Sequence, residues 1–159
     1  MRGAYAVGTK KTRVLVVEDN VPLACTWSEE LERRHYKVRH SIDVCGGLEL
    51  CKDQWPDAII LDAFFRDCCE AMVEASGSTF CAKLAELIQN SGHSAPLVIG
   101  VSGAVANEGQ SSGAFCGVPA SLMPIRVQKP VSGSDLADRL DEAKRRGQLK
   151  DPQQLGFVF

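Results

Sequence analysis

The sequence has 159 residues, of which 45% are hydrophobic and 24% charged, and its formal net charge is −2. This length suits one domain with a sizeable core, and the apolar fraction is too high for a disordered chain. No apolar run reaches the roughly 18 residues of a membrane span, and the lack of a basic excess argues against nucleic acid as the main partner. We therefore expect one globular domain that binds neither a membrane nor nucleic acid.

Short apolar segments along the chain predict the strands. Most are continuous and rich in β-branched residues, which is typical of strands buried on both faces of a parallel sheet. One alternates apolar and polar residues, so we expect one of its faces to be wetter, and the last is the weakest signal. The predicted strands are residues 14–17, 36–39 (the alternating one), 58–61, 97–101 and 125–127.

Between these segments, apolar residues recur at helical spacing. Leu23, Trp27 and Leu31 share one face of the first predicted helix, and Asp19 or Asn20 is suited to cap it. The predicted helices cover residues 22–34, 43–54, 80–90 and 134–146. Strands that alternate with helices predict a doubly wound α/β fold with a five-stranded parallel sheet.

Some regions fit this pattern poorly. Residues 63–79 form a long connection, and residues 103–123 should contain a further helix, although their glycines weaken it. We expect an N-terminal extension over residues 1–12, the domain over 13–146 and a tail over 147–159. The tail ends in aromatic residues, Phe157 and Phe159, and is expected either to fray or to dock them on the domain.

The seven cysteines favour reduced thiols in a cytoplasmic protein, because their number is odd and nothing in the sequence signals export. Most lie among small or apolar residues, where a thiol packs as a small hydrophobe. A zinc site is an alternative, but its ligands would follow no known spacing. Its ligands would be Cys68, Cys69, Cys81 and His93. A redox role for the adjacent Cys68 and Cys69 stays open.

The candidate metal-binding and reactive side chains follow the predicted strands. In such sheets, ligands bind at the carboxyl ends of the strands. Crowded carboxylates there would attract a hard cation such as Mg²⁺, and one of them could attack a phosphoryl group. An ammonium group would neutralise the oxygens of the transferring group. The residues in question are Glu18, Asp19, Asp62, Ser102 and Lys129.

Four segments in this order resemble the receiver domain of two-component response regulators. They are VLVVEDN at 14–20, DAIILD at 57–62, LVIGVSGA at 97–104 and VQKP at 127–130. Each segment alone is a weak signal, but their joint occurrence at compatible spacing is specific. The resemblance implies a flavodoxin-like fold with strand order 2-1-3-4-5.

The resemblance also implies a role for each site residue. Asp62 corresponds to the phosphoacceptor, and Mg²⁺ would be held by Glu18, Asp19, Asp62 and the backbone carbonyl of Phe64. Ser102 and Lys129 correspond to the residues that contact the phosphoryl group, and Pro130 to a structural proline that is often cis.

The implied function is that of a cytoplasmic, single-domain response regulator, a signalling protein and not an enzyme. Its phosphoryl donor would be a sensor histidine kinase or a histidine phosphotransfer protein. It would signal through contact with a downstream protein target, and a homodimer would be compatible with this role.

The sequence departs from the family pattern at several places. Arg126 stands where the family usually has a tyrosine or phenylalanine that turns inward on activation. Phe64 and Ala104 would flank the path of the hydrolytic water, and because neither side chain can orient it, we predict slow loss of the phosphoryl group. The alternative function is an interaction module that works without phosphorylation. A hydrolase of the haloacid dehalogenase type would need a second Asp two positions after Asp62, where Phe64 stands.

Overall fold

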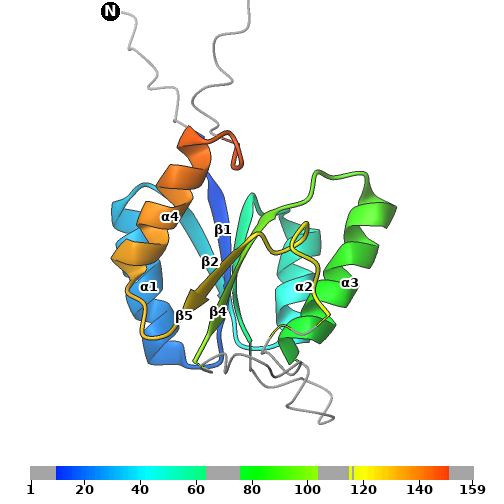
Figure 1. Cartoon of the computed structure of the whole chain (residues 1–159), viewed down its shortest axis with the longest axis horizontal. Helices are drawn as coiled ribbons and strands as arrows, with labels where there is room; N and C mark the ends of the chain where they lie inside the picture. Colours follow the sequence, from blue (N-terminus) through cyan, green and yellow to red (C-terminus); the bar gives the residue numbers. More distant parts are fainter. Residues whose placement is uncertain (1–9, 64–75, 104–114, 116, 151–159) are drawn as a thin grey trace, which may run out of the picture.

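The computed structural model describes residues 10–63, 76–103, 115 and 117–150 (Figure 1). Strands and helices alternate along these residues, as the apolar pattern predicted. The strands are β1 (Arg13–Val17), β2 (Lys37–Ser41), β3 (Ala58–Asp62), β4 (Leu97–Ser102) and β5 (Ile125–Gln128). The helices are α1 (Val21–Arg33), α2 (Val44–Asp53), α3 (Ser76–Ser91) and α4 (Gly133–Arg145).

All five strands form one parallel sheet in the order β2-β1-β3-β4-β5. The predicted fold class and strand order are therefore confirmed. β1 lies in the interior of the sheet, with Val17 beside Ser41 on one side and Leu61 on the other. The chain crosses from one half of the sheet to the other between β2 and β3, so the carboxyl ends of β1 and β3 lie beside the topological switch point.

Helices cover both faces of the sheet, α1 and α4 on one side and α2 and α3 on the other (Figure 1). Successive residues of the inner strands therefore enter different cores. Val16 and Ile60 pack in the core that α1 and α4 close, whereas Val17 and Leu61 pack in the core that α2 and α3 close. This double burial explains why the inner strands have continuous apolar sequences.

The predicted boundaries agree with the structure to within a few residues. α3 shows the largest difference, because it begins at Ser76, four residues before the predicted start at Phe80. Its first residues, SGST, are weak helix formers, so the apolar pattern becomes visible only at Phe80. The helix expected within 103–123 has no counterpart in the described part of that range, where residues 115 and 117–123 form turns and irregular chain.

The cysteines only partly meet the expectation of reduced thiols. Cys51 and Cys81 are free and buried, and burial raises the pKa of each thiol to about 11, so both are inert as nucleophiles. Cys25 is free and exposed. Cys45 contradicts the expectation, because it is disulfide-bonded. The proposed pair Cys68 and Cys69 lies outside the described residues, as do Phe157 and Phe159.

None of the helices in the described residues is both long enough and apolar enough to cross a membrane.

Cys81 and His93, two ligands of the alternative zinc site, lie in different surroundings. Cys81 belongs to α3 and is buried in the core, whereas His93 is exposed and stacks on Trp55 at a centroid distance of 4.7 Å. The two other ligands of that alternative lie outside the described residues.

The contact between α1 and α4 depends on a glycine. A Cβ added at Gly133 would lie 2.6 Å from Glu30 Cβ and 3.0 Å from Trp27 Cα. We expect Gly133→Ala to lower the free energy of unfolding by about 1–3 kcal/mol, because the two helices must move apart. Urea denaturation measures the loss. Gly103→Ala is the matched control, since a Cβ there meets no atom of the described residues within 4 Å, and an equal effect of both changes would contradict the prediction.

Candidate phosphoryl-acceptor site

Side chains from the ends of β1, β3 and β5 meet at the carboxyl edge of the sheet. Lys129 Nζ lies 3.0 Å from Glu18 Oε2 and 3.3 Å from Asp62 Oδ1. Ligand oxygens of Glu18, Asp19 and Asp62 all lie within 4.8 Å of one another. The structure therefore brings these four predicted site residues together.

Ser102, the fifth of these residues, ends β4 at the same edge and is half-buried. Its carbonyl oxygen accepts a hydrogen bond of 2.7 Å from the Lys129 backbone N–H. This bond fixes the start of the turn that follows β5. The peptide bond between Lys129 and Pro130 is cis, as the family resemblance implied. Phe64, whose backbone carbonyl was expected to bind the metal, lies outside the described residues, as does Ala104.

The backbone around Glu18 explains how its carboxylate is held in place. The Glu18 N–H donates to the Ser41 carbonyl at 3.0 Å, which continues the pairing of β1 with β2 beyond the last β1 residue. Glu18 Oε1 accepts from the Asn20 N–H at 3.2 Å. Asn20 in turn caps α1, because its side chain accepts from the Leu23 N–H at 3.1 Å. The predicted capping role is thus performed by Asn20, which leaves the exposed Asp19 carboxylate free of that role.

The site concentrates negative charge in a poorly solvated place. Glu18 and Asp62 are only 1% and 4% exposed. Burial raises the pKa of Asp62, and the charge of Asp19 adds to this, while Lys129 opposes it. Burial likewise raises the pKa of Glu18 against the hydrogen bond from Lys129. Two buried carboxylates thus share one ammonium group, and Asp19 adds further negative charge beside them.

Lys129 stays charged in this environment. Burial alone would lower its pKa, but the hydrogen bond to Glu18 and the charge of Asp62 outweigh burial and raise it. A cation held between carboxylates can also bind the oxygens of an incoming anion. The remaining negative charge fits a hard divalent cation such as Mg²⁺, because the donor set consists of carboxylate oxygens.

His40 is a neighbour of the site that the candidate site residues from the sequence did not include. Its Nε2 lies 2.7 Å from the Glu18 carbonyl oxygen, and the side chain is half-buried. The alternation of the predicted strand 36–39 stopped one residue short of His40, and β2 in fact continues to Ser41. A strand prediction extended by two residues would have placed His40 beside the end of β1.

Arg126, the atypical position, lies in β5 and contacts the segment that precedes this strand. Its Nη2 donates to the Val118 carbonyl at 2.7 Å, and its Cζ lies 6.0 Å from the centroid of the Phe115 ring. Phe115 is buried, and its ring lies directly over Gly100 of β4, where an added Cβ would come within 2.8 Å of it. Arg126 therefore attaches the segment before β5 to the edge of the sheet.

We expect Arg126→Met to loosen that segment. The change removes the hydrogen bond to the Val118 carbonyl, so the free energy of unfolding should fall by about 1 kcal/mol. Amide hydrogen exchange of residues 117–123 should accelerate more than exchange in α1. Arg33→Met is the control, because Arg33 pairs with Glu30 on the exposed surface. Unchanged exchange in 117–123 would show that Arg126 does not hold the segment.

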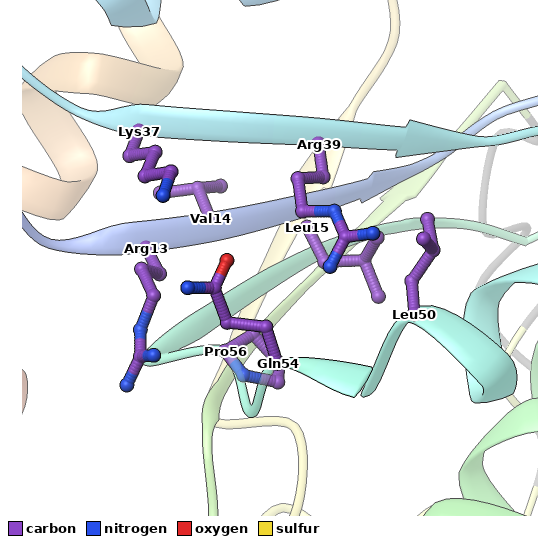
Figure 2. Close-up of a pocket in the computed structure, with 8 residues that line it drawn as sticks. All are labelled: Arg13, Val14, Leu15, Lys37, Arg39, Leu50, Gln54 and Pro56. Carbon is purple, nitrogen blue, oxygen red and sulfur yellow. The ribbon is translucent and has the colours of Figure 1, made fainter. Parts of the chain in front are cut away.

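A cavity at the other end of β1 and β2 is too small to compete with this site. Figure 2 shows Arg13, Lys37 and Arg39 among the residues around it. Its volume is about 10 Å³, which is roughly what one water molecule needs. Arg13 and Arg39 already pair with Asp57 and Asp53. The cavity therefore offers no space for a substrate or cofactor.

Comparison of the whole structure with solved structures gives a consistent result. A CheY-like response regulator receiver domain from Methanospirillum hungatei JF-1 is 18% identical, with a TM-score of 0.66, over 92% of this chain and 100% of that chain. The receiver domain of the Francisella response regulator 1452 is 20% identical, with a TM-score of 0.65, over 86% and 99%. A CheY-like receiver domain from Methylobacillus flagellatus is 21% identical, with a TM-score of 0.62, over 84% and 98%.

The chain has the receiver fold. Identities near 20% show the fold alone, since one fold hosts many functions. The sequence matches no protein-family model and no curated protein. The acidic residues and Lys129 occupy the carboxyl edge of the sheet, because each of them lies at or just beyond the end of a strand.

Proposed function

We propose that this protein is a response regulator receiver that accepts a phosphoryl group on Asp62. The observation that carries the proposal is the meeting of Asp62, the acidic pair and Lys129 at one edge of a sheet with the receiver fold. The donor would be a sensor histidine kinase or a histidine phosphotransfer protein. The phosphorylated form would signal through contact with a downstream protein, and Mg²⁺ would be required.

The proposed reaction is a phosphoryl transfer between two protein side chains. A carboxylate oxygen of Asp62 attacks phosphorus and forms an O–P bond, while the P–N bond of the donor phosphohistidine breaks. The released imidazole keeps the electron pair of that bond and takes up a proton. The product is an acyl phosphate on Asp62. Burial favours this step, because a desolvated carboxylate is a better nucleophile than a hydrated one.

Each neighbour of Asp62 has a distinct task in the proposal. Glu18, Asp19 and Asp62 would hold Mg²⁺, which neutralises negative charge on the phosphoryl oxygens when it is bound. Lys129 would exchange its contact with Asp62 for one with a phosphoryl oxygen. The hydroxyl of Ser102 would donate to another phosphoryl oxygen, and this contact would exist only in the phosphorylated state. The apolar Phe64 and Ala104 would leave the hydrolytic water without a hydrogen-bonding partner, so the acyl phosphate would persist.

A second candidate function is an interaction module that works without phosphate. Arg126 favours it, because the side chain at this position is bound to the Val118 carbonyl and no aromatic group is there to turn inward. The two candidates differ in what they require of Asp62. A phosphorylation-dependent receiver loses partner binding in Asp62→Ala, whereas the module keeps it.

Intact mass spectrometry tests the proposal. The protein is incubated with acetyl phosphate and Mg²⁺, and its mass is compared with that of Asp62→Asn under the same conditions. We expect one phosphoryl group on the wild type, none with a chelator present and none on Asp62→Asn. Because some receivers accept only from a protein donor, a phosphorylated histidine phosphotransfer protein serves as the second donor. Failure with both donors would contradict the proposal.

A further inference from the structure

Trp27 contacts Lys129 of the site from the side of the hydrophobic core. It belongs to α1, is 1% exposed and packs in the core that α1 and α4 close over the sheet. The helical spacing of apolar residues predicted that Trp27 lies on the apolar face of this helix, and its burial agrees. A buried indole also carries an N–H group that needs a hydrogen-bond acceptor. In this structure the acceptor belongs to the turn that follows Lys129.

The Trp27 indole N–H donates to the Val131 carbonyl oxygen at 3.0 Å. Val131 is two residues beyond Lys129, and the cis peptide bond of Pro130 lies between them. On the other side of this turn, the Lys129 N–H is bound to the Ser102 carbonyl. The backbone that carries Lys129 is therefore attached at two points, to β4 by its own N–H and to α1 through Trp27.

The ring of Trp27 also faces the ammonium group of the lysine. Lys129 Nζ lies 5.8 Å from the ring centroid, within the range of a cation–π interaction. The same nitrogen contacts Glu18 and Asp62. The ammonium thus has carboxylates on the side of the site and an aromatic face toward the core, which restricts where its flexible side chain can place it.

The turn after Lys129 leads directly into α4, whose first residues are held by capping hydrogen bonds. Ser132 caps α4, with its hydroxyl accepting from the Asp135 N–H at 3.0 Å and the Asp135 carboxylate accepting from the Ser132 N–H at 3.3 Å. Gly133 packs against the backbone of Trp27 itself, where an added Cβ would lie 3.0 Å from Trp27 Cα. Trp27 therefore contacts the turn from Lys129 to Gly133 at two places, at the Val131 carbonyl and at Gly133.

We propose that Trp27 is a positioning residue for Lys129, which it holds where the ammonium meets the phosphoryl group of Asp62. The proposal rests on the proposed function, because it concerns the same reaction. Trp27 touches no reacting atom. It acts through the hydrogen bond to the Val131 carbonyl and through its ring face.

A double-mutant cycle separates positioning from simple packing. The variants are Trp27→Phe, Lys129→Met and the two together, and the readout is the dissociation constant for beryllofluoride, a phosphoryl mimic, in the presence of Mg²⁺. We expect Trp27→Phe to weaken binding about fivefold, the usual worth of one hydrogen bond. In the Lys129→Met background the same change should weaken binding less than twofold, because the group that Trp27 positions is gone.

Trp55→Phe is the matched control. The indole N–H of Trp55 also donates to a backbone carbonyl, that of Ser94, at 2.9 Å, but Trp55 precedes β3 at the amino edge of the sheet. We expect no change in beryllofluoride binding in this variant. Replacement of Trp27 by 3-benzothienylalanine provides a second test that preserves the volume of the ring and removes only the N–H donor. It should reproduce the fivefold loss even if Trp27→Phe folds poorly.

The outcomes separate the two proposals. If the wild type binds beryllofluoride and Trp27→Phe weakens binding equally with and without Lys129, Trp27 acts through packing and the positioning role is wrong. Unchanged binding in the benzothienylalanine protein would also overturn it. If the wild type does not bind the mimic at all, the proposed function itself fails, and the positioning role with it.

Discussion

Asp62→Asn is expected to make the metal-free protein more stable and to weaken its stabilisation by Mg²⁺. Burial and the neighbouring Asp19 raise the pKa of Asp62, so its ionised form at pH 7 costs folding free energy. Asparagine keeps an oxygen for Lys129 and carries no charge. We expect a gain of about 1 kcal/mol, which corresponds to roughly 2–4 °C in melting temperature for a chain of this size.

Mg²⁺ should reverse this order. At a concentration about 100 times its dissociation constant, a ligand that binds only the folded state adds about 2.7 kcal/mol. The wild type should gain this amount and Asp62→Asn much less, because a ligand oxygen has lost its charge. Asp53→Asn is the control, since Asp53 pairs with Arg39 on the exposed surface. Equal Mg²⁺ responses in all three proteins would contradict a metal site at Asp62.

The pH dependence of the Asp62→Asn effect has a definite sign. A carboxyl group with a raised pKa in the folded state binds its proton more tightly there than in the unfolded state. The penalty is therefore full above the folded-state pKa and disappears as the pH falls toward the ordinary value of an aspartate. The stability advantage of Asp62→Asn in metal-free buffer should shrink on acidification. Urea denaturation at several pH values measures it.

Lys129→Met is expected to have the second large effect. Lys129 is the cation for two carboxylates that are themselves poorly solvated, Glu18 and Asp62. Its removal leaves their charges uncompensated, which is costly in a buried place. Because the lysine side chain is 26% exposed, we discount the full cost of a buried pair and expect a loss of about 1–3 kcal/mol at neutral pH in metal-free buffer.

The loss should depend on pH and on metal. Burial already raises the pKa of both carboxyl groups, and without Lys129 they protonate more readily, so the loss should diminish as the pH is lowered. Mg²⁺ should restore part of the stability by supplying another cation. Lys52→Met is the control, because Lys52 pairs with Glu49 on the exposed surface. A loss that is the same at every pH and unaffected by Mg²⁺ would indicate lost packing instead of lost charge compensation.

The fold was predictable because its determinants are local. The continuous apolar segments at 58–61 and 97–101 are typical of strands that are buried on both faces of a sheet. They form β3 and β4. The site was predictable in its members, because the residues that directly follow parallel strands meet at one edge. Glu18, Asp62 and Lys129 are brought together for this reason, although their sequence positions are far apart.

Other features depend on contacts that no local pattern encodes. The early start of α3 reflects close packing of Gly77, whose N–H donates to the Ala63 carbonyl just after Asp62. The partner of Arg126 is a backbone carbonyl. Every residue has such a carbonyl, so the sequence does not indicate which one Arg126 contacts. Trp27 has an apolar neighbourhood and a helical spacing, and these conceal its polar contact with Val131. The disulfide of Cys45 is a pairing, and an odd number of cysteines does not reveal pairings.

Borohydride trapping tests the phosphorylation of Asp62 itself. Borohydride reduces an acyl phosphate to an alcohol, so a phosphorylated aspartate becomes homoserine, and peptide mass spectrometry then locates it. After incubation with Mg²⁺ and a phosphohistidine donor, we predict homoserine at position 62 in the wild type and at no position in Asp62→Asn. Homoserine at another aspartate, or trapping that persists in Asp62→Asn, would contradict it.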